Sequence, residues 1–172
     1  MDTNQNKQSY ALPIAMMFAL FFMIAFVTGL QNPMGVIVKN QFQASNLLSQ
    51  LGNFANFLAY AFMGIPAGLM LQKIGYKKTA LTAILVGIAG VAITFFSGKI
   101  ESFAVYLIGA FVGGFSMCML NTVVNPMLNT LGGEGKTGNQ LLQFGGTLNS
   151  MGATIVPVLV GYLMGDVAKA TI

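Results

Sequence analysis

Charged residues divide this sequence into five long uncharged stretches. The chain has 172 residues, and its only charged side chains are eight lysines and four acidic residues. Between them lie uncharged segments at roughly 8–38, 40–72, 79–98, 102–133 and 137–165. Each is at least as long as the ~20 residues that a helix needs to cross the hydrocarbon core of a membrane. The pattern therefore predicts five transmembrane helices.

Composition also indicates a membrane protein. Hydrophobic residues make up 55% of the chain, charged residues 7%, and the mean hydropathy is +0.74, whereas soluble domains carry about 25% charged residues. The predicted fold class is an all-α membrane protein with five transmembrane helices. We expect a cytoplasmic tail at 1–10, a bundle over 11–165 with helices at about 11–37, 47–72, 79–98, 103–130 and 140–165, and a short tail at 166–172 that begins a missing connection to a sixth helix.

The sequence lacks the residues that several kinds of chemistry require. The chain contains no histidine, and its single cysteine, Cys118, falls inside a predicted span, which leaves no disulfide framework, imidazole proton relay or cysteine metal cluster. No acidic residue falls inside a span, so we expect no enzyme activity, no catalytic residues, no metal and no cofactor. The net charge of +4 lies at the membrane edges, which is typical of topology signals rather than of nucleic-acid contacts.

Lysines are distributed unequally between the two predicted membrane faces. Cytoplasmic loops are usually enriched in basic residues, and a cytoplasmic N-terminus places five lysines inside and three outside. The inside set is Lys7, Lys73, Lys77, Lys78 and Lys136, and the outside set is Lys39, Lys99 and Lys169. We therefore expect a multi-pass membrane protein with a cytoplasmic N-terminus.

Amide side chains recur at helical spacing within the predicted spans. Asn121, Asn125 and Asn129 stand at every fourth position, which places them on one face of a helix. Polar side chains in a membrane are costly unless partnered, so they tend to face the bundle interior or a water-filled cavity. By helical rise, Asn121 and Asn149 should lie at the same depth. The candidate substrate-binding residues are Asn32, Asn53, Asn56, Asn121, Asn125, Gln143 and Asn149.

Two interpretations of these amides compete. Amides both donate and accept hydrogen bonds, which suits a ligand covered in hydroxyl groups, and a sugar is the natural candidate. The alternative is a non-transporting polytopic scaffold or assembly protein, in which each amide only holds helices together and contributes about 0.6–2 kcal/mol. Such contacts need one or two polar partners, whereas this chain offers a larger set. The number of amides therefore favours a ligand.

Glycine pairs four residues apart are frequent in the spans. Close approach through small residues is the usual way that helices pack in lipid. We expect such packing at Gly64 with Gly68, Gly109 with Gly113, and Gly161 with Gly165. Together these pairs predict a tightly packed bundle.

A basic segment with two glycines, "GLMLQKIGYKK", separates the second and third predicted spans. A glycine allows two helix ends to approach, a second glycine turns the chain sharply, and lysines anchor it at the cytoplasmic headgroups. The pattern resembles the loop signature of the major facilitator superfamily, which lies between helices two and three. Gln72 stands where that signature has an acid. The residues of this signature are Gly68, Gln72, Lys73, Gly75, Lys77 and Lys78.

Three longer segments carry a more specific resemblance. The segments "IPAGLMLQKIGYKK", "NTVVNPMLNTLG" and "LNSMGATIVPVLVG" resemble the fucose, galactose and glucose symporter family of that superfamily, from about Phe21 to Gly165. The resemblance implies the first five helices of a twelve-helix fold in a bacterial inner membrane. It also implies uptake of a hexose or 6-deoxyhexose by alternating access, usually driven by protons. The implied partners are a sugar, a coupling ion, the lipid bilayer and the missing C-terminal half.

Two departures from the family bear on the coupling ion. A fucose-transporting member carries one acid in helix one, just before its Gln-Phe, and a second acid four residues before the Asn-Pro of helix four. In this sequence Val36 and Asn121 stand at those places. Coupling to protons, coupling to sodium and uncoupled transport therefore remain open.

Overall fold

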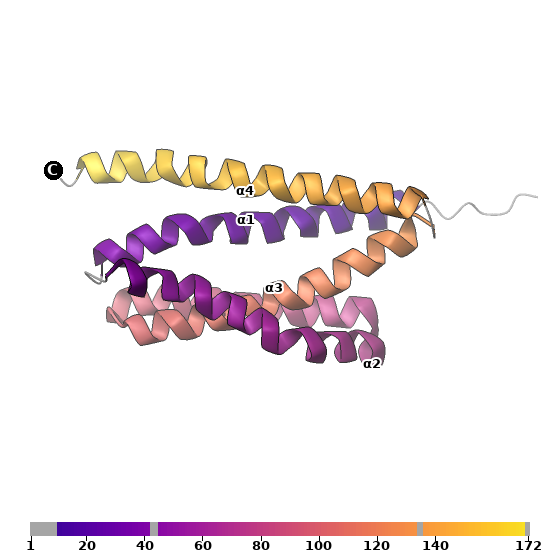
Figure 1. The fold of residues 1–172 in the computed structure, drawn as a ribbon, viewed down its shortest axis with the longest axis horizontal. Coiled ribbons are helices and arrows are strands. Elements are labelled where there is room, and N and C mark those ends of the chain that lie inside the picture. Colours follow the sequence, from indigo (N-terminus) through magenta and orange to yellow (C-terminus); the bar gives the residue numbers. More distant parts are fainter. Residues whose placement is uncertain (1–9, 42–44, 134–135, 171–172) are drawn as a thin grey trace, which may run out of the picture.

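A computed structural model describes residues 10–41, 45–133 and 136–170, with the side chains at 31–32, 34, 36, 41, 49 and 163–170 outside the description. All regular structure in these ranges is helical (Figure 1). The helices are α1 (Ala11–Gln41), α2 (Asn46–Ile100), α3 (Phe103–Leu131) and α4 (Lys136–Ala170). Each of the four is long and apolar enough to cross a membrane. The all-α membrane fold class is thus confirmed.

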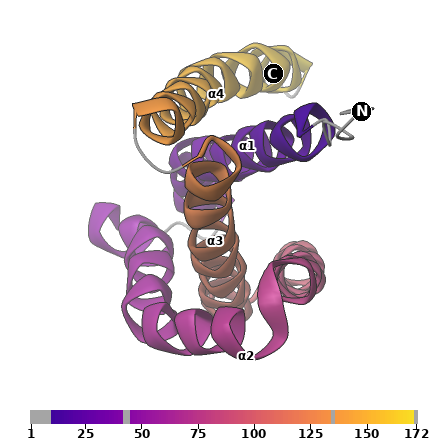
Figure 2. The same ribbon diagram turned by 90° about the vertical axis from the view of Figure 1, so that its right-hand side faces the viewer.

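Helix α2 consists of two arms that meet at Gly75. A straight helix of 55 residues would be about 80 Å long, far more than the ~30 Å hydrocarbon core. At Gly75 the backbone has φ 77° and ψ 171°, which is not helical. This region of φ and ψ is almost restricted to glycine, because glycine has no Cβ. Figure 2 shows the chain turning back at the end of the first arm.

The first arm of α2 runs parallel to α3. Asn56 contacts the carbonyl of Ala110, and Tyr60, one turn further along α2, contacts Asn121 further along α3. Residue numbers increase together in the two helices, so the two segments point in the same direction.

The second arm runs antiparallel to α3. The Ser116 hydroxyl donates to the carbonyl of Ala83, 2.6 Å away. Gly90, further along α2, lies against Gly113, which is earlier in α3. The two arms therefore run in opposite directions on α3, and they correspond to the second and third predicted crossings.

Helices α1 and α4 form a second, parallel pair. An added Cβ on Gly145 would lie 2.9 Å from the Phe21 ring, and one on Gly152 would meet the Ala25 methyl group at 2.6 Å. Glycines on α4 therefore allow side chains of α1 to approach its backbone closely. Figure 1 shows the two helices side by side along most of their length.

The hydrophobic core lies where α1 meets α3. Apolar side chains of α1 and α3 interlock there, with further contributions from both arms of α2. The buried core residues are Met17, Phe21, Ile24, Ala67, Ala83, Met117, Met119, Leu120, Val124 and Leu128. This core joins the α1–α4 pair to the α2–α3 unit.

The element boundaries differ from the predicted ones at several places, and α1 continues to Gln41 and α4 begins at Lys136, four residues beyond the expected bounds in each case. Helix α2 is continuous by hydrogen bonding across 73–78, where a polar link was expected, and only Gly75 interrupts its helical backbone. Helix α4 continues to Ala170, beyond the predicted end at 165. Residues 1–9 of the predicted N-terminal tail and residues 171–172 lie outside the described residues.

The predicted glycine contacts are confirmed at one pair. An added Cβ on Gly109 would meet the backbone nitrogen of Thr94 at 2.9 Å. The prediction is wrong for Gly64 and Gly68, where such a Cβ would have no neighbour within 4 Å in the described part of the chain. Spacing alone does not say which face of a helix is covered.

Candidate functional site

Asn121 and Tyr60 form a polar contact between α3 and the first arm of α2. The Asn121 amide nitrogen donates to the Tyr60 hydroxyl at 2.9 Å and to the carbonyl of Met117 at 3.2 Å. One turn earlier on α3, the Cys118 thiol donates to the backbone carbonyl of Tyr60 at 3.7 Å. Both side chains of the pair are half-buried. The thiol contact therefore holds the α2 backbone against α3 next to the hydrogen bond between Asn121 and Tyr60.

Asn149 lies on the face of α4 that packs against α1. Gly145, Gly152 and Val156 are buried on that same face, four residues before Asn149 and three and seven residues after it. The side-chain oxygen of Asn149 is buried and has no hydrogen-bond partner, and no other buried side-chain polar atom among the described residues lacks one. A buried acceptor without a donor is costly and calls for an explanation.

Asn53 and Asn56 lie in a different environment from Asn121 and Asn149. Asn56 is buried, with 6% of its surface exposed, and its amide nitrogen lies 3.5 Å from the Ala110 carbonyl. Asn53 donates instead to Gln50 on its own helix at 2.8 Å. Asn56 therefore links two helices, whereas Asn53 makes a local contact.

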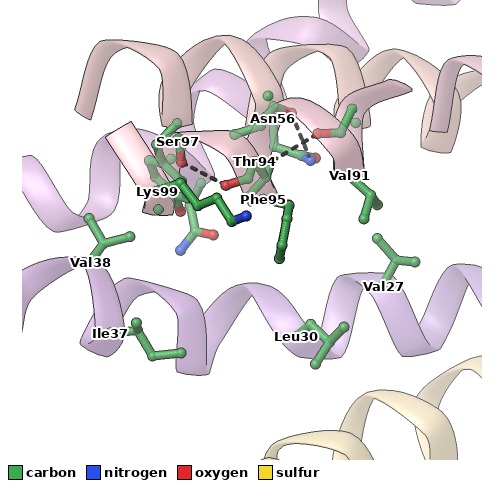
Figure 3. Close-up of a pocket in the computed structure, with 18 residues that line it drawn as sticks. Val27, Leu30, Ile37, Val38, Asn56, Val91, Thr94, Phe95, Ser97 and Lys99 are labelled. Atoms are coloured by element: carbon green, nitrogen blue, oxygen red, sulfur yellow. Dashed lines mark hydrogen bonds between the residues drawn. The ribbon is translucent and has the colours of Figure 1, made fainter. Parts of the chain in front are cut away.

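Both of these asparagines line a cavity of about 560 Å³ between α1, both arms of α2 and the start of α3. Figure 3 shows Val27, Leu30, Ile37 and Val38 on one wall. The facing wall carries Val91, Phe95 and Lys99, whose ammonium group lies 5.4 Å from the Phe95 ring centre. The remaining lining residues are Gly52, Asn53, Asn56, Gly90, Thr94, Ser97, Gly98, Tyr106, Gly109, Ala110 and Gly113.

Two of the hydroxyl groups in this cavity donate within their own helix. Thr94 donates to the Gly90 carbonyl at 2.9 Å, and Ser97 donates to the Thr94 carbonyl at 2.7 Å. With these two donors occupied and apolar side chains on both walls, the remaining polar side chains of the cavity are those of Asn53, Asn56, Tyr106 and Lys99. Asn121 and Asn149 do not line this cavity.

The other predicted binding residues are not gathered at one place. Asn125 and Gln143 are exposed. Asn129 is also exposed, and its side chain lies against Gly138 at the link between α3 and α4. The Asn32 side chain lies outside the described residues. No hydrogen bond joins the Asn121 and Asn149 side chains in the described part of the chain, because Asn121 bonds to Tyr60 and Met117 while the Asn149 oxygen has no partner.

The basic segment between the two arms of α2 forms a tight reversal. Gly75 supplies the non-helical backbone, and the Thr79 hydroxyl donates to its carbonyl at 2.9 Å. Lys73, Lys77 and Lys78 are exposed around the turn, as is Gln72, while Gly68 lies within the first arm. Lys136, at the start of α4, lies at the same end of the bundle (Figure 1).

A family comparison shows where this architecture belongs. The family model for the Major Facilitator Superfamily matches residues 17–168. The chain is a member of the major facilitator superfamily. Its relatives within the superfamily include the L-fucose-proton symporter of Escherichia coli, 29% identical over 157 residues. A glucose/galactose transporter of Brucella abortus is also 29% identical, over 153 residues.

These superfamily relatives are longer than the chain. The match to the E. coli symporter covers 91% of this chain and 35% of that protein, and the match to the Brucella transporter covers 89% and 37%. A crystal structure of the E. coli fucose:proton symporter has a TM-score of 0.71 and 28% sequence identity, with 91% of this chain and 37% of that chain covered. The chain therefore has the fold of about a third of a major facilitator protein.

Sequence reasoning left one residue of the polar pair out of the candidate site. Tyr60 follows Asn56 by one helical turn, so it belongs to the same stripe of the first arm. Its hydroxyl contact with Asn121 depends on how that arm is rotated about α3, which the spacing does not give. In this superfamily member, the contact makes Tyr60 a candidate site residue.

Proposed function

We propose that this chain forms part of the N-terminal half of a secondary transporter that carries a hexose or 6-deoxyhexose by alternating access. Membership of the major facilitator superfamily supports the transport class. The sugar class is supported by two relatives whose names specify fucose and glucose or galactose. The chain spans 35% and 37% of those proteins, so the opposite wall of the sugar site would come from further helices.

The observation that carries this proposal is the unpartnered oxygen of Asn149. It is a buried polar atom that meets no hydrogen-bond partner within the described chain, and a sugar hydroxyl, which can both donate and accept, would reach it where the α1–α4 contact opens during transport. Measured along their helices from the α3–α4 link, Asn121 and Asn149 lie about 15 Å and about 20 Å deep. Similar depths support a shared role near the middle of the membrane, where transporter substrate sites lie. Asn32, Asn53, Asn56, Asn125 and Gln143 are assigned here as secondary candidates.

The proposed location is a bacterial inner membrane with the N-terminus in the cytoplasm. The lysines of the described helices support this orientation, because four lie at the end with the α2 reversal and three at the opposite end. The four are Lys73, Lys77, Lys78 and Lys136, and the three are Lys39, Lys99 and Lys169. Proton coupling, sodium coupling and uncoupled transport are the alternatives for the mechanism, and two relatives are named as proton symporters.

Uptake of labelled sugars tests the proposal. Cells that express the complete protein containing this chain should accumulate at least one of fucose, glucose and galactose. The double variant Asn121→Leu, Asn149→Leu should lose that uptake at unchanged membrane abundance. Asn139→Leu serves as the matched control, because Asn139 is an exposed amide on α4 outside the proposed site. Failure of the wild type to take up any hexose, or full uptake by the double variant, contradicts the proposal.

A non-transporting scaffold is the second candidate, and interhelical bonds favour it. The Ser116 hydroxyl and the Asn56 amide both donate to backbone carbonyls of neighbouring helical segments, which is how polar groups hold membrane helices together. For a scaffold, the double variant should lower the yield of folded protein, and no sugar should raise the melting temperature of the wild type. A thermal-shift assay with fucose, glucose and galactose separates the two functions.

A further inference from the structure

The orientation of the Asn121 amide is fixed by its two partners. Amide oxygen and nitrogen atoms are hard to tell apart by shape, so their assignment has to come from the hydrogen bonds. A backbone carbonyl can only accept, and the carbonyl of Met117 lies 3.2 Å from one terminal atom of Asn121. That atom must therefore be the nitrogen. The same nitrogen lies 2.9 Å from the Tyr60 hydroxyl.

These contacts use both donors of Asn121. An amide nitrogen carries two hydrogens, and here one is directed to Tyr60 and the other to Met117. What Asn121 can still offer is its carbonyl oxygen, which only accepts. Without Tyr60, one amide hydrogen would lose its partner.

The Tyr60 hydroxyl has the opposite capacity. Its oxygen accepts from Asn121, and its own hydrogen is not bonded to any acceptor in the described part of the chain. Tyr60 and Asn121 together therefore present one donor and one acceptor side by side. Both residues are half-buried, so the pair keeps some accessible surface.

Neighbouring contacts hold Tyr60 in this position. The Cys118 thiol donates to its backbone carbonyl. One turn before Tyr60, an added Cβ on Gly114 would lie 2.7 Å from the carbonyl oxygen of Asn56. The first arm thus lies directly on α3 where the pair forms, and the Tyr60 side chain is preorganised before any ligand arrives.

We propose that Tyr60 is a specificity-determining residue of the sugar site, where its hydroxyl donates to one sugar hydroxyl while the Asn121 oxygen accepts from the neighbouring one. This inference rests on the proposed sugar-transport function. Tyr60 acts twice, once by direct contact with the sugar and once by keeping Asn121 turned as an acceptor. Adjacent hydroxyl groups on a sugar ring match such a pair, because each hydroxyl can both donate and accept.

The test is Tyr60→Phe in the complete protein, with uptake kinetics for the parent sugar and for its series of monodeoxy analogues. Loss of one neutral hydrogen bond should raise KM for the parent sugar about three- to tenfold, with maximal rate per transporter unchanged. For the one analogue that lacks the hydroxyl contacted by Tyr60, Tyr60→Phe should raise KM by a smaller factor than for the parent sugar, because only the loss of the Asn121 orientation then remains. Comparing the effect of Tyr60→Phe on KM for the parent sugar with its effect on KM for this analogue isolates the contact between Tyr60 and that hydroxyl.

Tyr162→Phe is the matched control, because Tyr162 is 74% exposed on α4 and should leave every KM unchanged. A purely structural role for Tyr60 predicts that Tyr60→Phe raises KM for all analogues by the same factor, and that result overturns the inference. Unchanged KM for the parent sugar overturns it as well, while leaving the proposed function intact. A wild type that transports no hexose would overturn the proposed function and this inference together.

Discussion

Gly90 lies against Gly113 so closely that a Cβ added to Gly90 would stand 2.8 Å from the backbone nitrogen of Gly113. This contact joins the second arm of α2 to α3 through backbone instead of side chains. A larger residue at position 90 would have to push the two helices apart, because backbone atoms cannot rotate away. Small residues at such contacts are the usual basis of close helix packing in lipid.

Gly90→Ala should therefore destabilise the protein by about 1–3 kcal/mol, the usual cost of overpacking. Gly113→Ala is the matched control, since a Cβ there has no neighbour within 4 Å and alanine is favoured over glycine in a helix. Thermal unfolding in detergent measures both variants. Equal melting temperatures for the two would show that the Gly90 contact is not tight.

Gly75→Ala should also destabilise the protein, for a different reason. Its φ of 77° and ψ of 171° lie in a region that is almost restricted to glycine, and placing another residue there costs about 1–3 kcal/mol. Gly64→Ala, in the first arm and with no neighbour within 4 Å, should be neutral or slightly stabilising. Melting temperatures check this pair, and a harmless Gly75→Ala would mean that the chain can reverse without a left-handed residue.

Membrane orientation can be measured with an impermeant thiol reagent. The native Cys118 is buried, with 6% exposure, and Cys118→Ala removes any background. In that variant, Gln72→Cys should be labelled only from the cytoplasmic side and Glu101→Cys only from the opposite side, because both positions are exposed at opposite ends of the bundle. Labelling of Gln72→Cys in intact cells would reverse the proposed orientation.

Sequence patterns predicted the order of the helical segments, because charge placement depends only on the chain. The uncharged stretches at 40–72 and 79–98 became the two arms of α2, and the glycine between them, Gly75, carries the non-helical backbone. These features are local, and a membrane strongly limits where charges can lie.

The arrangement of the amides could not be predicted in the same way. Helical spacing places Asn121 and Asn125 on one face, yet Asn121 bonds to Tyr60 while Asn125 is exposed. Which amide meets a neighbour depends on how each helix is rotated and how far it lies from the next. For the same reason, the contact between α4 and α1 beside Asn149 could not be predicted from the sequence.

The predicted packing at Gly64 and Gly68 failed for a related physical reason. A glycine pair permits close approach, but an approaching helix must also exist on that side. Gly109 has such a neighbour in the second arm of α2, whereas Gly64 has none within 4 Å in the described residues. Motif spacing gives the capacity for contact, and the tertiary arrangement decides whether it is used.

The unpartnered oxygen of Asn149 gives the most direct test of the sugar site. Removing a buried polar group that lacks a partner should leave stability unchanged or increase it, since the unmet acceptor costs about 1–3 kcal/mol. Asn149→Leu should therefore keep or raise the melting temperature of the complete protein while abolishing hexose uptake, with Asn139→Leu normal in both. Full hexose uptake by a correctly folded Asn149→Leu variant would contradict the account.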